Sequence, residues 1–478
     1  MSEKHAGGRQ KEAKLAVVIM AAGKGTRLKS RKPKVLHEVG GKALLSHVIA
    51  AAGQVVNAKD IFIIVGHEAE QVRNAVADSG VQFVEQREQR GTGHAIQCVL
   101  ESLGNYENVL VLSGDVPLIR SETIERLWRF HQAEDAAMTI LTAAPENPAG
   151  YGRVVRQKGG SAEVEGIIED EALTPQQRSM GEINSGIYAF KTPALETHLG
   201  GLKTNNTRGE LYLTDMAGLL RSAGERVVAV QAEDTAEVLG ANTLAELAVL
   251  DAAMRAATAN RLMAAGVTIF RPDTCVIDAD VEVAADAVIE PFVQLLRRTR
   301  IGAETVVRSF SVIENCTIGE RVIIRQSCVL ADSSVAGGAD IGPFARIRPG
   351  SEIGEDVHIG NFVEVKKSKL HTGVKAGHLA YLGDAEIGAG TNIGAGVITC
   401  NYDGVHKHVT RIGEGVFVGS DSTLVAPIAI EDGAYIGAGS CITKDVPAGA
   451  LAVGRGRQVT KEGWAESRRA RRKAQEQG

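Results

Sequence analysis

Aliphatic residues return at every sixth position through most of the C-terminal part of the chain. Three series share this spacing: Ile277, Val283, Ile289, Leu295, Ile301, Val307 and Ile313; Ile323, Val329, Val335, Ile341, Ile347, Ile353, Ile359 and Val365; and Ile412, Val418, Leu424, Ile430, Ile436 and Ile442. This period fits neither an α-helix, which repeats every ~3.6 residues, nor an ordinary strand, which repeats every ~2. It is typical of a β-helix, whose triangular coils have three flat sides of about six residues, each directing one aliphatic side chain inward. The pattern therefore predicts a β-helix over about residues 267–446.

Glycines and irregularities refine this prediction. Many of the periodic residues are followed by Gly, which permits tight corners. Ordinary β-hairpins would instead need alternation of period two and clear turn dipeptides, which this segment lacks. The period slips near residues 315–323 and 366–381, and residues 399–411 interrupt it. Such irregularities predict loops that leave the coil, where solenoids usually place binding residues.

The N-terminal part of the chain has a different pattern. Residues 15–22 are nearly all apolar, as expected for a strand buried on both faces of a parallel sheet. Further strands are predicted at residues 61–65, 81–85 and 109–112, and helices at residues 43–52 and 68–77. This alternation predicts an α/β fold with a Rossmann-like, mostly parallel sheet.

Composition suggests five segments. Residues 1–14 are rich in Gly, Lys and Glu and are predicted to be a disordered tail. The α/β domain is expected over residues 15–240, and the β-helix over 267–450. Residues 241–265 contain neither Gly nor Pro and predict one long helix, so 241–266 is expected to link the two domains. Residues 451–478 are expected to form a C-terminal arm and a solvated basic tail.

Length, charge and cysteine usage exclude several classes of protein. A chain of 478 residues is too long for one core. The formal net charge of −5 gives no reason to expect nucleic-acid binding. The cysteines are scattered without a CxxC pair, which argues against a disulfide framework or a zinc site: Cys98, Cys275, Cys316, Cys328, Cys400 and Cys441. No apolar run reaches membrane-spanning length and no signal-peptide core is present, so a cytoplasmic protein is expected.

A glycine-rich turn directly follows the first predicted strand. It reads Gly23-Lys24-Gly25-Thr26-Arg27, and Lys34 comes shortly after. Backbone N–H groups of such a turn can surround an anion, and the two cations Arg27 and Lys34 add positive charge. The turn is neither a Walker A loop nor a full GxGxxG fingerprint, and taken alone it is a weak signal for phosphate.

The longer string AAGKGTRLKSRKPKVL resembles the signature of sugar-nucleotide pyrophosphorylases, which join a nucleoside triphosphate to a sugar 1-phosphate. The resemblance covers residues 15–240 and implies that Arg27 and Lys34 neutralise phosphate charge during catalysis. The attacking sugar phosphate is already an anion, so the reaction needs charge neutralisation and alignment rather than a general base. The resemblance also implies nucleotide contacts at Met20, Ala21, Ala22, Gly23, Gly25, Lys34, Ser113 and Gly114.

By the same resemblance, Asp115 and Asn242 hold Mg²⁺, a cation that prefers oxygen ligands. The family often has Tyr where this chain has Ser113, and we expect little effect on metal binding because the carboxylate is unchanged. Matched positions that read the uracil edge are Gln86, Gly91 and Thr92, and those that contact the sugar are Gly152, Glu169 and Asn184.

Four strings lie near the irregularities of the β-helix: GPFARIRPG, NFVEVKKSKL, AGHLAYLGDAEIG and TNIGAGVITCNYDG. Together with the N-terminal part they resemble a family of bifunctional bacterial enzymes, over residues 17–464. These enzymes acetylate glucosamine 1-phosphate from acetyl-CoA and then transfer uridylyl from UTP, giving UDP-N-acetylglucosamine for peptidoglycan and lipopolysaccharide synthesis. The resemblance also implies that the β-helix is left-handed, an exception to the usual crossover rule.

The resemblance assigns a second site. His378 is the base that takes a proton from the 2-ammonium of the sugar, a role suited to an imidazole. Glucosamine 1-phosphate is held by Arg348, Lys366, Tyr381 and Asn392. Acetyl-CoA is contacted by Ala395, Asn401, Tyr402, Ser420, Ala438 and Arg455, of which Asn401 and Tyr402 also help to position the amine.

By resemblance the chain forms a homotrimer, with acyl-CoA sites between neighbouring β-helices. Two other classes stay open at this point. One is a single-activity sugar-nucleotide pyrophosphorylase whose β-helix only oligomerises or regulates. The other is a scaffold without catalysis, against which the intact glycine-rich loop argues.

Overall fold

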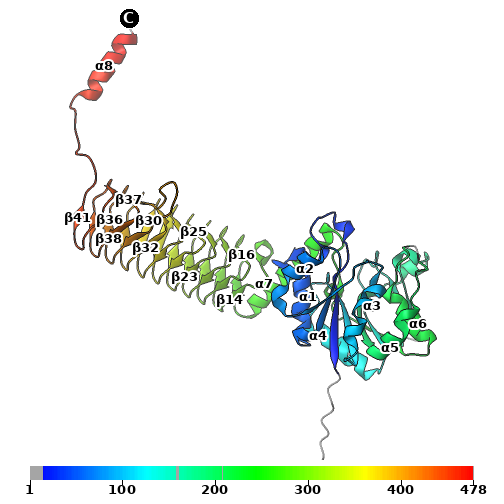
Figure 1. The fold of residues 1–478 in the computed structure, drawn as a ribbon. Coiled ribbons are helices and arrows are strands. Elements are labelled where there is room, and N and C mark those ends of the chain that lie inside the picture. Colours follow the sequence, from blue (N-terminus) through cyan, green and yellow to red (C-terminus); the bar gives the residue numbers. More distant parts are fainter. Residues whose placement is uncertain (1–13, 158–160, 207, 477–478) are drawn as a thin grey trace, which may run out of the picture. The chain divides into compact units, whose positions relative to one another are not determined.

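The computed structural model describes residues 14–157, 161–206 and 208–476. The chain divides into two compact units between residues 257 and 258 (Figure 1). The tail predicted to be disordered, residues 1–14, lies outside the described residues except for Lys14. In the part of the chain that the structure describes, none of the helices combines the length and apolar character that a bilayer crossing needs.

The N-terminal unit is built on one mixed sheet. Its strands are β1 (Leu15–Met20), β4 (Ile61–Val65), β5 (Gln82–Glu85), β6 (Asn108–Ser113), β7 (Met138–Ala143), β8 (Arg153–Arg156), β9 (Val164–Ile168), β10 (Ile183–Lys191) and β11 (Val227–Gln231). The order is β11-β7-β10-β6-β1-β4-β5, and β8 joins β9 to the side of β10. β1 is parallel to β4 and β6, whereas β10 is antiparallel to β6 and β7. The prediction of a mostly parallel α/β sheet is confirmed.

Helices cover both faces of this sheet (Figure 1). They are α1 (Leu44–Ala52), α2 (Ala69–Ala75), α3 (Thr92–Leu103), α4 (Ser121–Ala133), α5 (Thr192–His198) and α6 (Met216–Ser222). One apolar core packs α1, α2 and α4 against the sheet, and a second packs α3, α5 and α6 against its other face. β1 is buried between the two cores, which explains its nearly continuous apolar sequence. β2 (Glu38–Val39) and β3 (Lys42–Ala43) form a separate hairpin.

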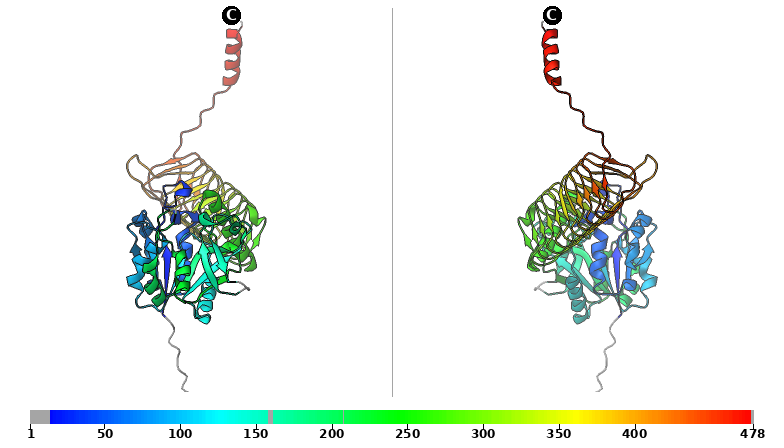
Figure 2. Two further views of the ribbon diagram at one scale, coloured as in Figure 1. Left: turned by 90° about the vertical axis from the view of Figure 1, so that its right-hand side faces the viewer. Right: turned by 90° about the vertical axis from the view of Figure 1, so that its left-hand side faces the viewer.

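The C-terminal unit is a three-sided parallel β-helix, whose stacked coils are visible in Figures 1 and 2. Sheet I runs from β12 (Thr268–Ile269) to β41 (Leu451–Ala452), sheet II from β13 (Val276–Ile277) to β40 (Cys441–Ile442), and sheet III from β14 (Glu282–Val283) to β38 (Ile428–Ile430). Each coil contributes one short strand to each sheet. The inward aliphatic side chains stack on their equivalents in the next coil and form one continuous core.

The predicted inward positions are confirmed for the first and third series, and one stretch of the second series is wrong. Ile323 and Val329 point outward, and their neighbours Ile324 and Leu330 are buried instead. Val329 is 43% exposed and Leu330 is fully buried. The reason is that the corner between sheets II and III sometimes contains one residue fewer, so that Leu330 is followed by Val335 after five residues. With aliphatic residues at both adjacent positions, the period alone does not decide which one faces the core.

Two further helices complete the chain. The helix predicted for residues 241–265 is α7 (Leu244–Ala264). The basic tail, which the sequence did not predict to be helical, contains α8 (Trp464–Glu476), and all of its residues are exposed. The proposed domain limits at residues 240, 266 and 450 stay predictions.

Candidate functional site

The glycine-rich turn after β1 packs against the segment that carries Lys34. The backbone of Gly25 has a positive φ of 59°, and a Cβ atom there would lie 2.6 Å from the Cβ of Lys34. Only glycine fits this approach without displacement of its neighbour. Two short 3₁₀ helices follow, η1 (Thr26–Leu28) and η2 (Lys34–Leu36), and they carry the two predicted cations.

Four predicted residues converge beside this turn. The Oδ1 of Asn242 accepts hydrogen bonds from Arg27 Nη2 at 2.7 Å and from Lys34 Nζ at 2.9 Å. Lys34 Nζ also forms a salt bridge with Oδ2 of Asp115, which lies just past β6. The structure therefore brings together both predicted phosphate-neutralising cations and both predicted metal ligands.

Ser113 contributes directly to this cluster, because its hydroxyl donates to Asp115 Oδ1 at 2.7 Å. Burial acts to raise the pKa of Asp115, but the Lys34 ammonium and the hydrogen bonds from Lys34 and Ser113 together hold that pKa below its ordinary value. Asp115 is thus an ionised carboxylate at neutral pH. The serine that stands where the family often has tyrosine helps to orient it.

The oxygens of Asp115 and Asn242 fit a magnesium ion. Oxygens of both side chains contact one cationic nitrogen, Lys34 Nζ. The two oxygens therefore face a common position that suits a cation. The described residues contain no cluster of three or more His, Cys, Asp or Glu side chains that could hold a metal. Mg²⁺ does not need such a cluster, because it usually takes one or two protein oxygens and completes its shell with water and phosphate.

A cleft of about 460 Å³ opens beside this cluster. Nine predicted nucleotide contacts line it: Met20, Ala22, Gly23, Gly25, Lys34, Gln86, Gly91, Thr92 and Asn242. The sequence missed other lining residues, among them Arg208 and Glu210, which come from a segment far along the chain. Ala21, Ser113, Gly114 and Asp115 are not among the lining residues.

The three predicted sugar contacts form a neighbouring polar group. Asn184 N donates to Gly152 O at 2.9 Å, and a Cβ added to Gly152 would lie 3.6 Å from Glu169 Oε2. Two residues that the sequence missed fix these side chains. Thr214 Oγ1 donates to Glu169 Oε1 at 2.6 Å, and Asn184 Nδ2 donates to the Tyr188 hydroxyl at 2.8 Å. Burial raises the pKa of Glu169, although the hydrogen bond from Thr214 opposes this effect.

In the β-helix, predicted phosphate-binding cations stack in adjacent coils of sheet II. β25 (Arg346–Arg348) pairs with β28 (Glu364–Lys366), so that Arg348 and Lys366 are direct neighbours. Arg348 Nη1 donates to Glu364 Oε1 at 2.7 Å. The next strand, β31 (Tyr381–Gly383), places Tyr381 beside Glu364. Arg348, Lys366 and Tyr381 therefore share one face of the β-helix.

A third cation, Lys407, was missed by the sequence analysis. Residues 399–411, which interrupt the six-residue period, include a small hairpin in which Tyr402 pairs with Lys407. The neighbouring Lys366 side chain and its positive charge lower the pKa of Lys407. Two neighbouring positive charges that repel each other favour an anion between them. The interruption of the six-residue period at residues 399–411 was the only sequence signal near this position.

His378 has one ring nitrogen engaged by a neighbouring coil. It ends β30 (Lys375–His378) and lies beside Asn361, which ends β27 (His358–Asn361). His378 Nδ1 is 2.6 Å from Asn361 Oδ1. An amide oxygen only accepts hydrogen bonds, so Nδ1 carries the proton and Nε2 keeps a free lone pair. His378 is exposed, and its Nε2 can accept a proton from a substrate.

Residues predicted to contact acetyl-CoA form a column above His378. The register that pairs Lys375 with Asn392 places Ala395 next to His378. Asp421 N donates to Ala395 O and Gly439 N donates to Ser420 O, which stacks Ala395, Ser420 and Ala438 in consecutive coils. Arg455 Nη1 donates to Ala438 O at 2.7 Å and ends the column.

Three other residues predicted to bind substrates lie outside the column of Ala395, Ser420 and Ala438. Asn401 is buried, and its side-chain amide donates to Asp384. Tyr402 is exposed on the hairpin, and its hydroxyl donates to Gly404 O at 2.6 Å. Asn392 lies on β33 (Asn392–Ile393) in sheet I, whereas Tyr381 lies in sheet II. One copy of the β-helix therefore does not gather the four predicted sugar-phosphate contacts on one face.

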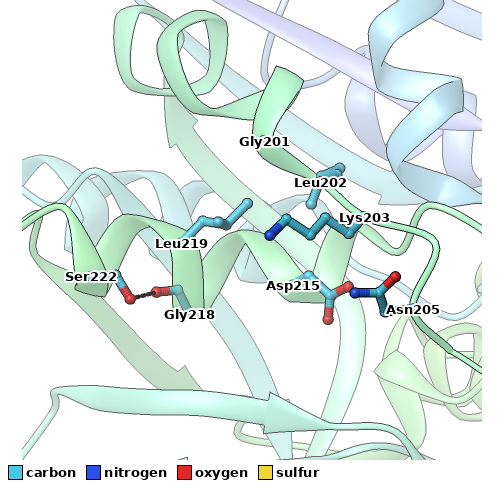
Figure 3. A pocket seen from close by; sticks show the side chains of 8 residues that line it. All are labelled: Gly201, Leu202, Lys203, Asn205, Asp215, Gly218, Leu219 and Ser222. Atoms are coloured by element: carbon cyan, nitrogen blue, oxygen red, sulfur yellow. Dashed lines mark hydrogen bonds between the residues drawn. The ribbon is translucent and has the colours of Figure 1, made fainter.

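The N-terminal unit has another cleft, of about 390 Å³, beside α6 (Figure 3). Lys203, Asn205 and Asp215 are among its lining residues, and Ser222 Oγ donates to Gly218 O at 2.8 Å. None of the predicted site residues lines it. It is therefore not part of the candidate sites.

Known proteins match both units. The family described as MobA-like NTP transferase domain matches residues 17–170, and bacterial transferase hexapeptide (six repeats) matches residues 410–444. Bifunctional protein GlmU of Koribacter versatilis (strain Ellin345) is 59% identical over 461 residues, which cover 96% of this chain and 98% of that protein. The chain belongs to the bifunctional GlmU family. Bifunctional protein GlmU of Solibacter usitatus (strain Ellin6076) is 49% identical over 456 residues, covering 95% and 97% of the two chains.

Membership of the GlmU family confirms the predicted resemblance and the prediction that one chain carries two transferase activities. The nucleotidyltransferase match falls in the α/β unit and the hexapeptide match in the β-helix. The stacked parallel strands and hexapeptide repeats are consistent with the predicted left-handed β-helix. The alternative of a single-activity pyrophosphorylase with a regulatory β-helix does not fit a bifunctional family.

Proposed function

We propose that the chain acetylates glucosamine 1-phosphate from acetyl-CoA and then joins the product to UTP, giving UDP-N-acetylglucosamine and pyrophosphate. The observation that carries this proposal is the presence of two separate polar centres of matching chemistry. One is the cluster of Arg27, Lys34, Asp115 and Asn242 in the α/β unit. The other is His378, with its free Nε2, in the unit that carries the cations Arg348 and Lys366.

In uridylyl transfer, an oxygen of the sugar phosphate attacks the α-phosphorus of UTP and the bond to pyrophosphate breaks. Arg27 and Lys34 lie beside the cleft lined by the glycine-rich turn, where they can neutralise the triphosphate and the leaving group. Asp115 and Asn242 are the residues that would hold Mg²⁺, which when bound adds positive charge to the phosphates. Since the nucleophile is an anion, no residue needs to act as a base.

The sugar is selected by the polar group around Glu169. Thr214 fixes one oxygen of this carboxyl and leaves the other, Oε2, on the side of Gly152. Asn184 is anchored by Tyr188. Fixed polar groups of this kind can discriminate an acetamido sugar from its free amine, because a mismatched buried polar group loses its hydrogen bond. Acetylation would therefore precede uridylylation.

In acetyl transfer, Arg348, Lys366 and Lys407 bind the sugar phosphate by charge. His378 Nε2 takes a proton from the 2-ammonium, and the freed amine attacks the thioester carbonyl. The carbon–sulfur bond breaks, and the departing CoA thiolate takes the second proton that the nitrogen loses as it becomes an amide. Asn361 holds the imidazole in the tautomer that this role requires. The small side chains of the column above His378 leave room for the pantetheine arm.

We extend the proposal to a homotrimer joined along the edge between sheets I and II. Exposed aromatic rings stack along this edge, with centroids 5.1 Å apart for Phe292 and Phe310 and 5.4 Å apart for Phe344 and Phe362. Among the described residues, no stacked aromatic rings lie on sheet III, which carries ion pairs such as Arg300 with Glu282. His378 lies on the apolar edge, so a neighbouring copy could supply the missing Asn392.

Two assays on the full-length chain test the proposal. With Mg²⁺, UTP and N-acetylglucosamine 1-phosphate, pyrophosphate should be released. With acetyl-CoA and glucosamine 1-phosphate, free CoA thiol should be released. A protein that makes pyrophosphate but consumes no acetyl-CoA, while sedimenting as a trimer, would contradict the bifunctional proposal and favour an oligomerising β-helix.

A further inference from the structure

Gln86, a predicted uracil contact, is held by two neighbours at the cleft. It is only 3% exposed and lines the cleft beside the glycine-rich turn. Its Nε2 lies 3.1 Å from Gly91 O and 3.1 Å from His94 Nδ1. His94 belongs to the first turn of α3, and its other ring nitrogen, Nε2, lies 3.9 Å from the sulfur of Cys98, one turn further on.

These contacts fix the orientation of the Gln86 amide. A backbone carbonyl only accepts hydrogen bonds, so the group of Gln86 that faces Gly91 O is the amino group and not the amide oxygen. That amino group has two hydrogens, and His94 Nδ1 receives the second. Both donors are therefore used within the protein. The amide oxygen Oε1 accepts no hydrogen bond from the described residues and is the only group that Gln86 offers to a ligand.

The same contacts fix the tautomer of His94. Its Nδ1 faces a donor and must carry the lone pair, so the ring proton sits on Nε2. The sulfur of Cys98 lies on that side and can accept this proton weakly. Cys98 thus favours the tautomer in which His94 accepts from Gln86. Cys98, His94 and Gln86 thus form a chain of contacts that fixes which way the Gln86 amide oxygen faces.

We propose that His94 is a positioning residue for base selection, which keeps the Gln86 carbonyl turned toward the nucleotide base and so favours uracil over cytosine. This inference rests on the proposed uridylyl transfer and on Gln86 as the residue that reads the base. The N3 atom of uracil carries a hydrogen and can donate to a carbonyl. The N3 atom of cytosine carries a lone pair and would meet the carbonyl oxygen as a second acceptor, which is unfavourable when both are desolvated.

Backbone groups next to Gln86 complete the complementarity. Gly91 and Thr92 stand at the N-terminus of α3, where N–H groups have no intrahelical acceptor, and both residues line the cleft. The site therefore offers N–H donors next to one carbonyl acceptor. The edge of uracil presents the complementary pair, an acceptor oxygen beside the N3 donor. Cytosine has an amino group in place of O4 and a lone pair on N3, so it matches neither group at that edge.

The experiment compares UTP and CTP as substrates of variants at residue 94. Steady-state kcat/KM is measured on the full-length protein with Mg²⁺ and N-acetylglucosamine 1-phosphate. His94→Ala and His94→Phe both remove the acceptor, and Phe keeps most of the ring volume. In both, the ratio of kcat/KM for UTP to that for CTP should fall by about tenfold or more, because the Gln86 amide can then rotate. His94→Asn places Oδ1 near the position of Nδ1 and should restore most of the ratio.

The outcomes separate the two proposals. If the wild-type protein does not turn over UTP, the proposed function itself is wrong. If it turns over UTP and the ratio is unchanged in His94→Ala and His94→Phe, or if His94→Asn does not differ from them, the positioning role is overturned. A structural defect would lower turnover of both nucleotides alike and leave the ratio unchanged. Acetyl transfer by the β-helix unit should be unaffected in every variant and serves as the control for intact protein.

Discussion

The side chain of Asn361 lies directly beside that of His378 in the adjacent coil, with 2.6 Å between Oδ1 and Nδ1. Because the two residues are paired in register, the coil itself fixes the orientation of the imidazole. His378→Ala should reduce acetyl transfer by roughly two to four orders of magnitude, the usual contribution of a general base.

Asn361→Leu should lower kcat for acetyl transfer by about tenfold, whereas Asn361→Asp, which keeps an acceptor, should change it far less. Uridylyl transfer should be unchanged in all three, and equal loss in both assays would indicate misfolding instead.

Lys34→Ala should abolish most uridylyl transfer and leave acetyl transfer intact. Its ammonium contacts both Asp115 and Asn242, so its loss removes positive charge at the point where phosphates and metal meet. A decrease in kcat of about a hundredfold or more is expected for one lost electrostatic contact at a reacting phosphate. Lys32→Ala, which removes an exposed pair with Glu38, is the matched control. Uridylyl transfer that survives in Lys34→Ala would show that its assigned role is wrong.

Lys407→Ala should weaken binding of glucosamine 1-phosphate. Lys366 is close enough to lower the pKa of Lys407, which places two positive charges where one phosphate can bridge them. Loss of a charge-assisted contact should raise KM for the sugar phosphate by about tenfold, with a smaller effect on kcat. Lys407→Arg should retain most of the affinity. Lys369→Ala is the control, because Lys369 lines a cleft of about 400 Å³ together with Lys407 but pairs with Glu352 on sheet III, and it should leave KM unchanged.

His131 should make the N-terminal unit less stable in acid. This histidine is 1% exposed, and burial lowers its pKa from 6.5 to about 4, assisted by the nearby Lys191. Above pH 6.5 the residue is neutral in both the folded and the unfolded state. Between pH 6.5 and 4 only the unfolded chain binds the proton, so the free energy of unfolding decreases as the pH falls, by on the order of 3 kcal/mol in total.

Urea denaturation at pH 7 and pH 5 checks this prediction. Trp128, whose ring stacks on His131 with centroids 6.0 Å apart, reports unfolding of this region by fluorescence. The only other tryptophan is Trp464, which Trp464→Phe removes from the signal. His131→Asn keeps a polar group near Thr139 but does not titrate, so it should lose most of the pH dependence. An unchanged pH dependence in this variant would assign the effect to other groups.

Several parts of the fold follow directly from the sequence. Apolar runs of the right length fixed β1 and β4, because a strand buried on both faces tolerates no polar residue. The six-residue period identified the β-helix, but not the inward residue where two aliphatic residues are adjacent, as at Val329 and Leu330. The helical tail α8 has few apolar residues and therefore no periodic signal.

Some residues of the candidate sites could also be predicted from the sequence. Arg27 and Lys34 stand close together in a recognisable string, whereas Asn242 joins them only through the tertiary fold. Lys407 and Thr214 were missed for the same reason: each is an ordinary residue in its local sequence. Their placement depends on a hairpin in one case and on the packing of β9 with the segment before α6 in the other.

The hairpin that contains Tyr402 and Lys407 is an insertion in one coil. Ile393 pairs with Val418 across it, as Ala376 pairs with Ile393 one coil earlier, so the ladder of strands continues unbroken past the insertion. The coils on either side of the insertion are therefore paired with each other independently of the hairpin. Shortening this excursion to an ordinary corner should leave a folded prism that keeps Arg348 and Lys366 but lacks Tyr402 and Lys407, so that it binds both substrates more weakly. The hairpin could then be removed without unfolding the β-helix that carries it.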